Sequence, residues 1–330
     1  METKEKAMTP YLRILPKEEG CERASFDLYL PASEEGKVYT LYHFAYEVNE
    51  RKPSLAYGEG PNDPANRCHY RIRTAEIVKR EGDAFRPICD ALRGGEVGLA
   101  IHEEGAGDYV GGLHGDEVLS EVTLSVGGRA LPLDGDFSGE AGDFTFSEVS
   151  TIYRCNTPTQ PIARHTVTYT VDRGRLLLSA ELTWLTEAKA PVTAFMPMLT
   201  APRIDMKDPL RILTDTVELY DEGGELLAAF DTTPYGAEPT EGLPTHLGKG
   251  TQATSARIYK KDGGLSVFGG YTCPDGSIPK AQRASNVWIR FGGAKDSKVY
   301  FEIGAGAHPT EGTVWRSCIV YEITYKEKDL

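Results

Sequence analysis

The sequence lacks the features that mark membrane and exported proteins. None of its 330 residues lies in an apolar run approaching the ~20 residues that cross a bilayer as a helix. The segment from Met1 to Pro16 is charged and has no apolar signal core. We therefore expect a cytoplasmic protein with no membrane partner.

Positive charge is scarce. The chain has 36 Lys and Arg against 49 Asp and Glu, which gives a formal net charge of −13. Such a balance repels phosphate backbones, and no dense basic patch reverses it locally. The sequence therefore argues against nucleic acid as a partner.

Motifs for nucleotide and hydrolase chemistry are absent. There is no P-loop, no Rossmann glycine fingerprint, no GxSxG and no HExxH. The six cysteines form no CxxC pair, so we expect free and mostly buried thiols. We expect no cofactor, and a divalent metal stays open as an alternative for one loop described below.

Helical periodicity is almost missing. The one helix predicted is short, covers residues 83–92 and is interrupted by Pro87. With 35 Gly, 20 Pro and 17 Tyr, the composition suits short strands joined by tight turns. Period-two alternation predicts strands or hairpins over residues 38–48, 124–133, 144–155, 165–184, 256–268, 287–303 and 314–325.

The hairpin over residues 165–184 is the strongest of these segments. Val167, Tyr169 and Val171 alternate with threonines before the turn Asp172-Arg173-Gly174, and apolar residues alternate on the return to Trp184. We predict an all-β fold, a large antiparallel two-sheet β-sandwich (supersandwich) with very little helix. No composition break marks a linker, so we expect an N-terminal tail over 1–20 and a single domain over 21–330.

The loop AIHEEGAGDYVGGLHGDE, residues 100–117, concentrates histidines, carboxylates and glycines. One interpretation makes His114 a general acid or base, with Asp116 or Glu117 as its carboxylate partner. A second places a divalent metal on His102, His114 and Asp108, although the spacing matches no recognised metal motif. A third makes the segment a solvated, turn-rich connection.

Other side chains complete the candidate site. His165, at the start of the strongest hairpin, is a second acid/base candidate, and a strand-end histidine is its structural alternative. Arg290 and Trp288 share the polar face of one strand, where arginine can grip a carboxylate and tryptophan can stack on a sugar ring. Arg154 beside a strand and His246 in a long loop are further candidates for substrate binding.

These segments resemble the galactose mutarotase-like β-supersandwich group. The resemblance is carried by HTVTYTVDRGRLLLSAELTW at 165–184, by GGLHGDE at 111–117 ahead of it, and by the long alternating strands through Tyr325. It spans about residues 20 to 325. The group includes aldose epimerases, sugar-binding domains and the β-sandwich parts of some polysaccharide lyases.

The resemblance implies sugar chemistry by a histidine with a carboxylate or tyrosine. The mutarotase pattern has a mid-chain catalytic His and a late catalytic Glu, and this pattern does not map onto single motifs of the present sequence. Under the resemblance His165 stands for one histidine, and Glu302 or Glu311 for the late acid.

We therefore expect a carbohydrate-active protein whose partner is a sugar or oligosaccharide. It would be a sugar epimerase or glycan lyase that uses His/carboxylate proton transfer. The alternatives are a non-catalytic carbohydrate-binding protein and a structural β-sandwich of an assembly. An enzyme requires a histidine and a carboxylate within hydrogen-bond reach in one pocket.

Overall fold

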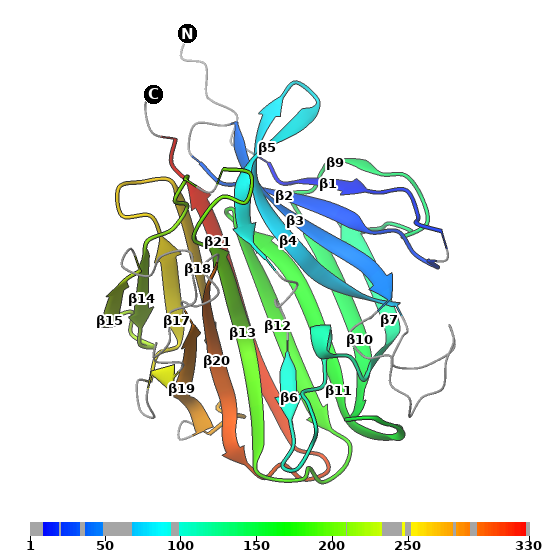
Figure 1. Cartoon of the computed structure of the whole chain (residues 1–330). Helices are drawn as coiled ribbons and strands as arrows, with labels where there is room; N and C mark the ends of the chain where they lie inside the picture. Colours follow the sequence, from blue (N-terminus) through cyan, green and yellow to red (C-terminus); the bar gives the residue numbers. More distant parts are fainter. Residues whose placement is uncertain are drawn as a thin grey trace.

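The computed structural model is built almost entirely from antiparallel strands (Figure 1). It describes residues 9–19, 21–33, 37–48, 68–93, 99–208, 210–232, 246–247, 252–279, 282–290 and 296–327. Within these ranges the strands form three sheets, and the 3-10 helix η2 (Gly112–His114) lies just before β7 (Glu117–Val126). The prediction of an all-β sandwich with very little helix is confirmed.

The largest sheet has ten strands and supplies one whole layer. Its order is β15 (Leu226–Asp231), β14 (Thr216–Tyr220), β17 (Ser255–Tyr259), β18 (Leu265–Thr272), β21 (Val314–Tyr325), β12 (Arg175–Trp184), β11 (Thr157–Asp172), β10 (Phe144–Arg154), β7 and β8 (Arg129–Ala130). Its centre is the predicted hairpin of β11 and β12, which pair from Ala163 opposite Trp184 to Asp172 opposite Arg175.

Two smaller sheets make the opposite layer. The six-stranded sheet runs β5 (Ala84–Leu92), β4 (Cys68–Glu81), β3 (Val38–Val48), β2 (Phe26–Pro31), β1 (Tyr11–Ile14) and β9 (Ser138–Glu140). The five-stranded sheet runs β16 (His246–Leu247), β19 (Arg283–Arg290), β20 (Asp296–Ala307), β13 (Val192–Pro202) and β6 (Ala100–His102). In Figure 1 both lie in front of β10, β11 and β12.

Aromatic side chains join the two layers. Phe44 of β3 packs against Tyr169 of β11 with ring centroids 5.2 Å apart. At the other end, Tyr271 of β18 packs against Phe301 of β20 at 5.9 Å. These residues alternate with polar neighbours along each strand, so the period-two pattern brings the apolar face of each sheet to one shared core.

Arg93 connects the two smaller sheets. Its backbone N–H donates to the carbonyl of Thr200 in β13 at 2.9 Å. Its guanidinium contacts Asp90 of β5 and Asp296 of β20, the latter at 3.0 Å. The front layer is therefore held together by hydrogen bonds and ion pairs beside the β5 edge as well as by the shared core.

The helix predicted over residues 83–92 is wrong, because this segment is strand β5. β5 is an edge strand and pairs only with β4 among the described strands. Pro87 lacks an N–H, and an edge strand tolerates that loss because one side of its ladder is open. The proline that we read as an interruption of a helix instead fits a sheet edge.

Strand β1 lies within residues 1–20, the segment predicted as a tail. It pairs with β2 from Tyr11 opposite Tyr29 to Ile14 opposite Phe26, and with β9 on its other side. Leu12 is fully buried. The sheet therefore begins before residue 20. No helix in the described part of the chain is long and apolar enough to span a membrane.

Candidate functional site

A small cavity lies between the inner face of the ten-stranded sheet and the first residues of β4. Its volume is about 50 Å³. We call it the Glu117 cavity. It is lined from β7, β10 and β11 by Glu117, Leu119, Glu148, Ser150, His165, Val167 and Tyr169, from β4 by His69, Tyr70 and Arg71, and from the loops around β6 by Leu99 and Gly112.

Strand register explains why these polar groups share one face. Along β11, His165, Val167 and Tyr169 point inward. On the neighbouring β10, Ser150 lies opposite His165 and Glu148 lies opposite Val167. Glu148 and His165 are therefore diagonal neighbours, at backbone positions about 7–8 Å apart.

Glu117 and His165 form a buried hydrogen-bonded pair. The Oε1 atom of Glu117 lies 3.1 Å from Nδ1 of His165, and each side chain is 10% exposed. Ser150 Oγ donates a hydrogen bond to the same oxygen, and the Gly112 N–H donates to Oε2 at 2.5 Å. Burial acts to raise the pKa of Glu117, but His165, Ser150 and Gly112 together lower it to about 2.

The backbone around Gly112 is shaped for this contact. Gly111 and Gly112 have φ values of +90° and +49°, in the region that favours glycine. A Cβ on Gly111 would lie 3.0 Å from the carbonyl oxygen of Leu99, and one on Gly112 would lie 3.2 Å from it. The two glycines let this turn lie against Leu99 and bring the Gly112 N–H to the carboxylate.

Glu117 contacts Nδ1 of His165 and leaves the second ring nitrogen, Nε2, for another partner. Nε2 is buried and has no hydrogen-bond partner among the described residues. Because Glu117 holds Nδ1, a proton exchanged between this histidine and a ligand would pass through Nε2. This nitrogen is therefore available to a ligand that enters the cavity.

Glu148 and Tyr169 lie beside the Glu117–His165 pair. Burial and the negative charge of Glu117 raise the pKa of Glu148 well above its ordinary value, against a hydrogen bond from Tyr169. Burial and the same two carboxylates also raise the pKa of Tyr169. The cavity therefore holds one carboxyl group with a lowered pKa and one with a raised pKa, and pKa values that diverge in this way are typical of acid and base pairs.

His114 and the carboxylates assigned to it make contacts with other residues. Glu117 pairs with His165, and the ring of His114 lies beside Tyr109 with centroids 5.3 Å apart. Asp116 is buried and accepts a hydrogen bond from the Asn156 N–H at 3.3 Å. The chain turns sharply here, since Gly115 has φ +80° and Asp116 has φ +56°.

The alternative metal ligands do not converge. Tyr109 lies between the rings of His102 and His114, at 5.0 Å from the first and 5.3 Å from the second. The nearest approach of His114 Nδ1 to Asp108 Oδ1 is 3.9 Å. In the ranges that the structure describes, no group of three or more His, Cys, Asp or Glu side chains could hold a metal ion.

The guanidinium group of Arg154 binds other groups of the protein. This group donates to both oxygens of buried Glu103, at 2.9 and 3.1 Å, to Gln160 and to the carbonyl of Glu187. It does not line the Glu117 cavity. These contacts tie β10 to the segment after β6 and to the one after β12, and the substrate-binding role of Arg154 stays a prediction.

Other candidates lie elsewhere or outside the described side chains. The backbones of Trp288 and Arg290 belong to β19 and that of His246 to β16, but their side chains are outside what the structure describes. Glu302 is buried on β20, and its charge adds to burial in raising the pKa of Tyr109. Glu311 is exposed in the turn before β21. Neither glutamate lines the Glu117 cavity.

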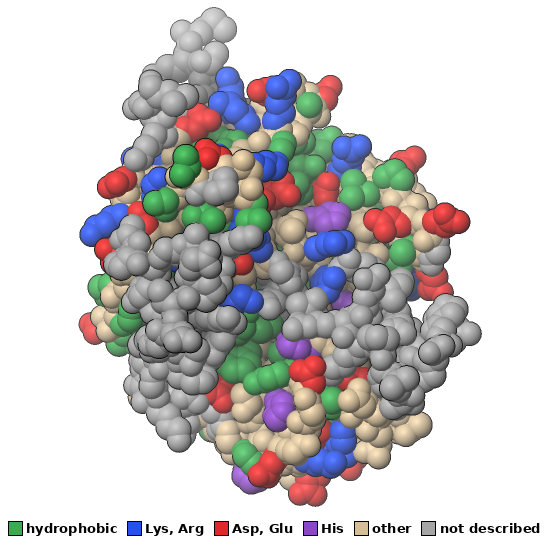
Figure 2. Space-filling view, in the orientation of Figure 1, with side chains coloured by type: hydrophobic (Ala, Val, Ile, Leu, Met, Phe, Trp, Pro, Cys, Tyr) green, Lys and Arg blue, Asp and Glu red, His purple; other side chains and the backbone are tan. Residues whose placement is uncertain are grey.

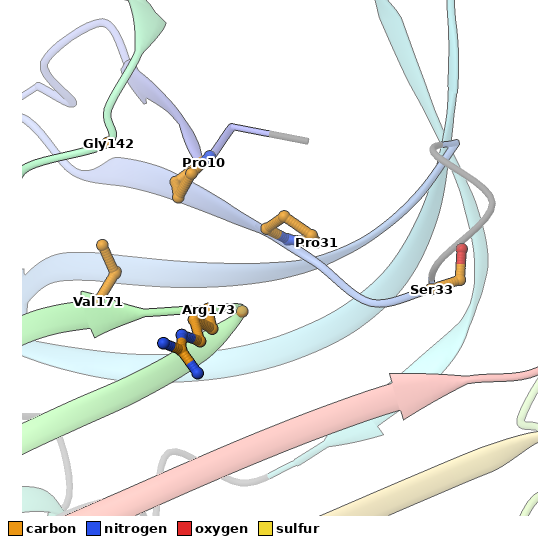
Figure 3. Close-up of a pocket in the computed structure, with 7 residues that line it drawn as sticks. Pro10, Pro31, Ser33, Gly142, Val171 and Arg173 are labelled. Atoms are coloured by element: carbon orange, nitrogen blue, oxygen red, sulfur yellow. The ribbon is translucent and has the colours of Figure 1, made fainter. Parts of the chain in front are cut away.

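A larger cavity of about 330 Å³ lies at the turn of the β11–β12 hairpin (Figure 3). Pro10, Pro31 and Val171 line it, and among the described residues Arg173 is its one charged lining residue. The Arg173 side chain is 90% exposed. Because no acid or base converges here among the described residues, the smaller cavity is the candidate site.

Figure 2 shows how basic and acidic side chains are distributed on one face of the molecule. Histidine side chains and several basic side chains follow one another down the middle of this face, whereas acidic side chains are spread around it. His69 and Arg71 reach the Glu117 cavity from β4. In a chain of net charge −13, basic groups gathered at a cavity favour a ligand rich in oxygen acceptors.

Comparisons with known proteins show no family. No protein-family model and no curated protein matches the chain. Solved structures that it is similar to include a candidate mutarotase from Salmonella typhimurium (9% identity, 96% of this chain and 97% of that one, TM-score 0.38), galactose 1-epimerase from Lactobacillus acidophilus (9%, 97% and 100%, 0.33) and a candidate aldose 1-epimerase from Escherichia coli K12 (12%, 77% and 96%, 0.33).

The solved structures that resemble this chain are thus aldose epimerase- and mutarotase-like proteins, the group that the sequence itself resembles. At these TM-scores and identities the likeness carries no argument about activity. The chemistry has to come from the Glu117 cavity.

Proposed function

We propose that this protein is a sugar epimerase that interconverts the two anomers of an aldose by paired proton transfer. The carrying observation is His165, which lines the cavity. Its Nδ1 is held by buried Glu117, and its Nε2 is buried without a partner among the described residues. The sugar class comes from the resemblance of residues 111–117 and 165–184, and the proton chemistry comes from the cavity.

The reaction needs a group that accepts the proton of the anomeric hydroxyl. As that proton leaves, C1 becomes a carbonyl carbon and the bond from C1 to the ring oxygen breaks. Nε2 of His165 suits this step because the Glu117 carboxylate stabilises the imidazolium that forms. Glu117 acts here through His165 and is a positioning residue.

The size of the cavity restricts how a sugar binds. A volume of about 50 Å³ admits the reacting end of a sugar rather than a whole ring. Ser150, His69 and Arg71 place hydrogen-bonding groups at its wall, which suits hydroxyl groups around C1. Epimerisation at the anomeric end is thus favoured over cleavage of a long polysaccharide, which would need an extended groove.

The test is acceleration of anomer exchange. Freshly dissolved α-anomers of neutral aldoses, their 6-phosphates and uronic acids would be followed by polarimetry and by proton NMR exchange spectroscopy. We expect at least one sugar class to equilibrate faster than in buffer, and His165→Asn to abolish the acceleration. No acceleration with any aldose, together with sugar-induced thermal stabilisation, would favour the alternative of a binding protein.

A further inference from the structure

Glu148 is a buried carboxyl group that the step at His165 does not use. It lines the same cavity, and its position on β10 is diagonal to His165 on β11. We propose that Glu148 is the proton donor that works opposite His165, an inference that rests on the proposed sugar epimerase activity. Glu148 would deliver its proton to the ring oxygen of the aldose.

The surroundings of Glu148 favour the neutral acid. Glu117, on the neighbouring strand β7, lines the same cavity, and its lowered pKa keeps it negatively charged. The apolar side chains of Leu119 and Val167 complete this part of the wall. The other polar and titratable groups that face the cavity are His165 and Tyr169 from β11, Ser150 from β10, and His69, Tyr70 and Arg71 from β4. Burial together with the charge of Glu117 keeps the proton on Glu148.

Tyr169 is the positioning residue for this acid. Its hydroxyl is hydrogen-bonded to Glu148, and its own pKa is raised by burial and by the two carboxylates, so it stays a neutral donor. When the phenol donates to one oxygen of the carboxyl group, the other oxygen carries the proton. Tyr169 thereby selects which oxygen of Glu148 is the donor.

The two groups give a balanced cycle. His165 Nε2 takes the proton of the anomeric hydroxyl, C1 becomes a carbonyl, and the electrons of the bond from C1 to the ring oxygen go to that oxygen, which takes the proton of Glu148. The open-chain aldehyde rotates about its C1–C2 bond. On closure Glu148 recovers its proton from the attacking hydroxyl and His165 returns its proton to the carbonyl oxygen, so both groups end as they began.

The experiment compares Glu148→Gln with a matched control, Glu218→Gln. Glu218 also accepts hydrogen bonds from tyrosine hydroxyls, those of Tyr220 and Tyr259, but it lies on β14 and does not line the Glu117 cavity. Glutamine keeps the shape of the neutral acid and cannot give up a proton. We expect Glu148→Gln to lower the rate of anomer exchange by about 10²-fold or more, and Glu218→Gln to leave it within about twofold.

An infrared measurement at pH 7 detects directly whether Glu148 is protonated. The spectrum of the wild-type protein minus that of Glu148→Gln should contain the carbonyl band of a protonated carboxylic acid, and the corresponding Glu218→Gln difference serves as the comparison. An active wild type whose Glu148→Gln variant keeps its rate, or a Glu148 that is ionised at pH 7, overturns this inference alone. A wild type that accelerates no aldose overturns the proposed function and the inference with it.

Discussion

Among the described residues, two histidine–carboxylate pairs lie within hydrogen-bond distance, in very different places. His165 and Glu117 lie 3.1 Å apart in a cavity on the inner face of the large sheet, and each side chain is 10% exposed. His43 of β3 and Asp27 of β2 lie 2.8 Å apart, with side chains 28% and 13% exposed. The shorter contact is the less buried one and lines neither cavity described above, so contact distance does not identify a site.

What sets the inner pair apart is its neighbours. Glu117 accepts hydrogen bonds from Ser150 and Gly112 in addition to His165, so the carboxylate is fixed on three sides. A second carboxyl group, Glu148, lines the same cavity and has a raised pKa. Preorganised groups in a buried cavity are what proton-transfer catalysis needs. Asp27 also accepts a hydrogen bond from Tyr29 and lies near Glu76, a carboxyl group with a raised pKa, but these residues line neither cavity.

The largest contrast is expected when each histidine is replaced by asparagine. In the His165→Asn variant the new amide would still present an N–H group near the position of Nδ1, but the variant has no counterpart of Nε2. We expect His165→Asn to lower the rate of anomer exchange by about 10³-fold, and His43→Asn to change it less than twofold. Polarimetry on the sugar that the wild type accepts best measures both. Equal effects of the two variants would contradict the assignment of His165.

Replacing the carboxylates should separate the pairs in stability. Glu117→Gln breaks a buried hydrogen-bonded pair and places an amide N–H₂ group among donors, so we expect it to lower the free energy of unfolding by about 3 kcal/mol. Asp27→Asn removes a partly exposed pair, and we expect a loss below about 1 kcal/mol. Urea unfolding at pH 7 gives both values. A similar small loss in both variants would show that burial does not distinguish the two pairs.

The stabilising effect of Glu117 should depend on pH in a defined direction. Its pKa is about 2 in the folded protein and 4.5 ordinarily. The stabilisation is therefore complete above pH 4.5 and is lost as the pH falls toward 2. We expect the difference in free energy of unfolding between wild type and Glu117→Gln to shrink as the pH is lowered from about 5 to about 2, as urea unfolding at each pH would show. A constant difference would mean that Glu117 is not the ionised partner.

Glu148 should give the opposite dependence. Its pKa is raised in the folded protein, so the unfolded chain ionises first and the folded state loses stability as the pH rises above 4.5. We expect Glu148→Gln, which has no proton to lose, to become more stable relative to wild type between about pH 5 and pH 8. Thermal unfolding across this range tests it, and a difference that stays flat would contradict the raised pKa.

Strand periodicity was enough to predict much of the fold from the sequence. The segments 38–48 and 314–325 are strands β3 and β21 with the predicted bounds, and the hairpin over residues 165–184 is the centre of the large sheet. Segment 83–92 was read as a helix because a single proline gives no sign of whether it interrupts a helix or lies on a sheet edge. That difference depends on neighbouring strands, which are tertiary information.

The members of the site could be found from sequence, but not their pairing. Glu117 and His165 were both candidates, yet they are 48 residues apart and meet only through the register of β7, β10 and β11. Glu148 and Ser150 were missed. A signal existed for Glu148, since it occupies the inward phase of a strand together with Phe146 and Ile152, where a charged residue is unexpected.

The smallest effect is expected at His114, the residue that the sequence favoured most. His114 lies beside Tyr109, is separated from the Glu117 carboxylate by a turn through Gly115 and Asp116, and does not line the Glu117 cavity. We expect His114→Ala to change the rate of anomer exchange less than about fivefold and to keep the pH dependence of the wild type, because the proton-transfer groups are untouched. A loss as large as that of His165→Asn would move the acid/base chemistry to the loop over residues 100–117, and the His165–Glu117 pair would then be a structural pair like that of His43 and Asp27.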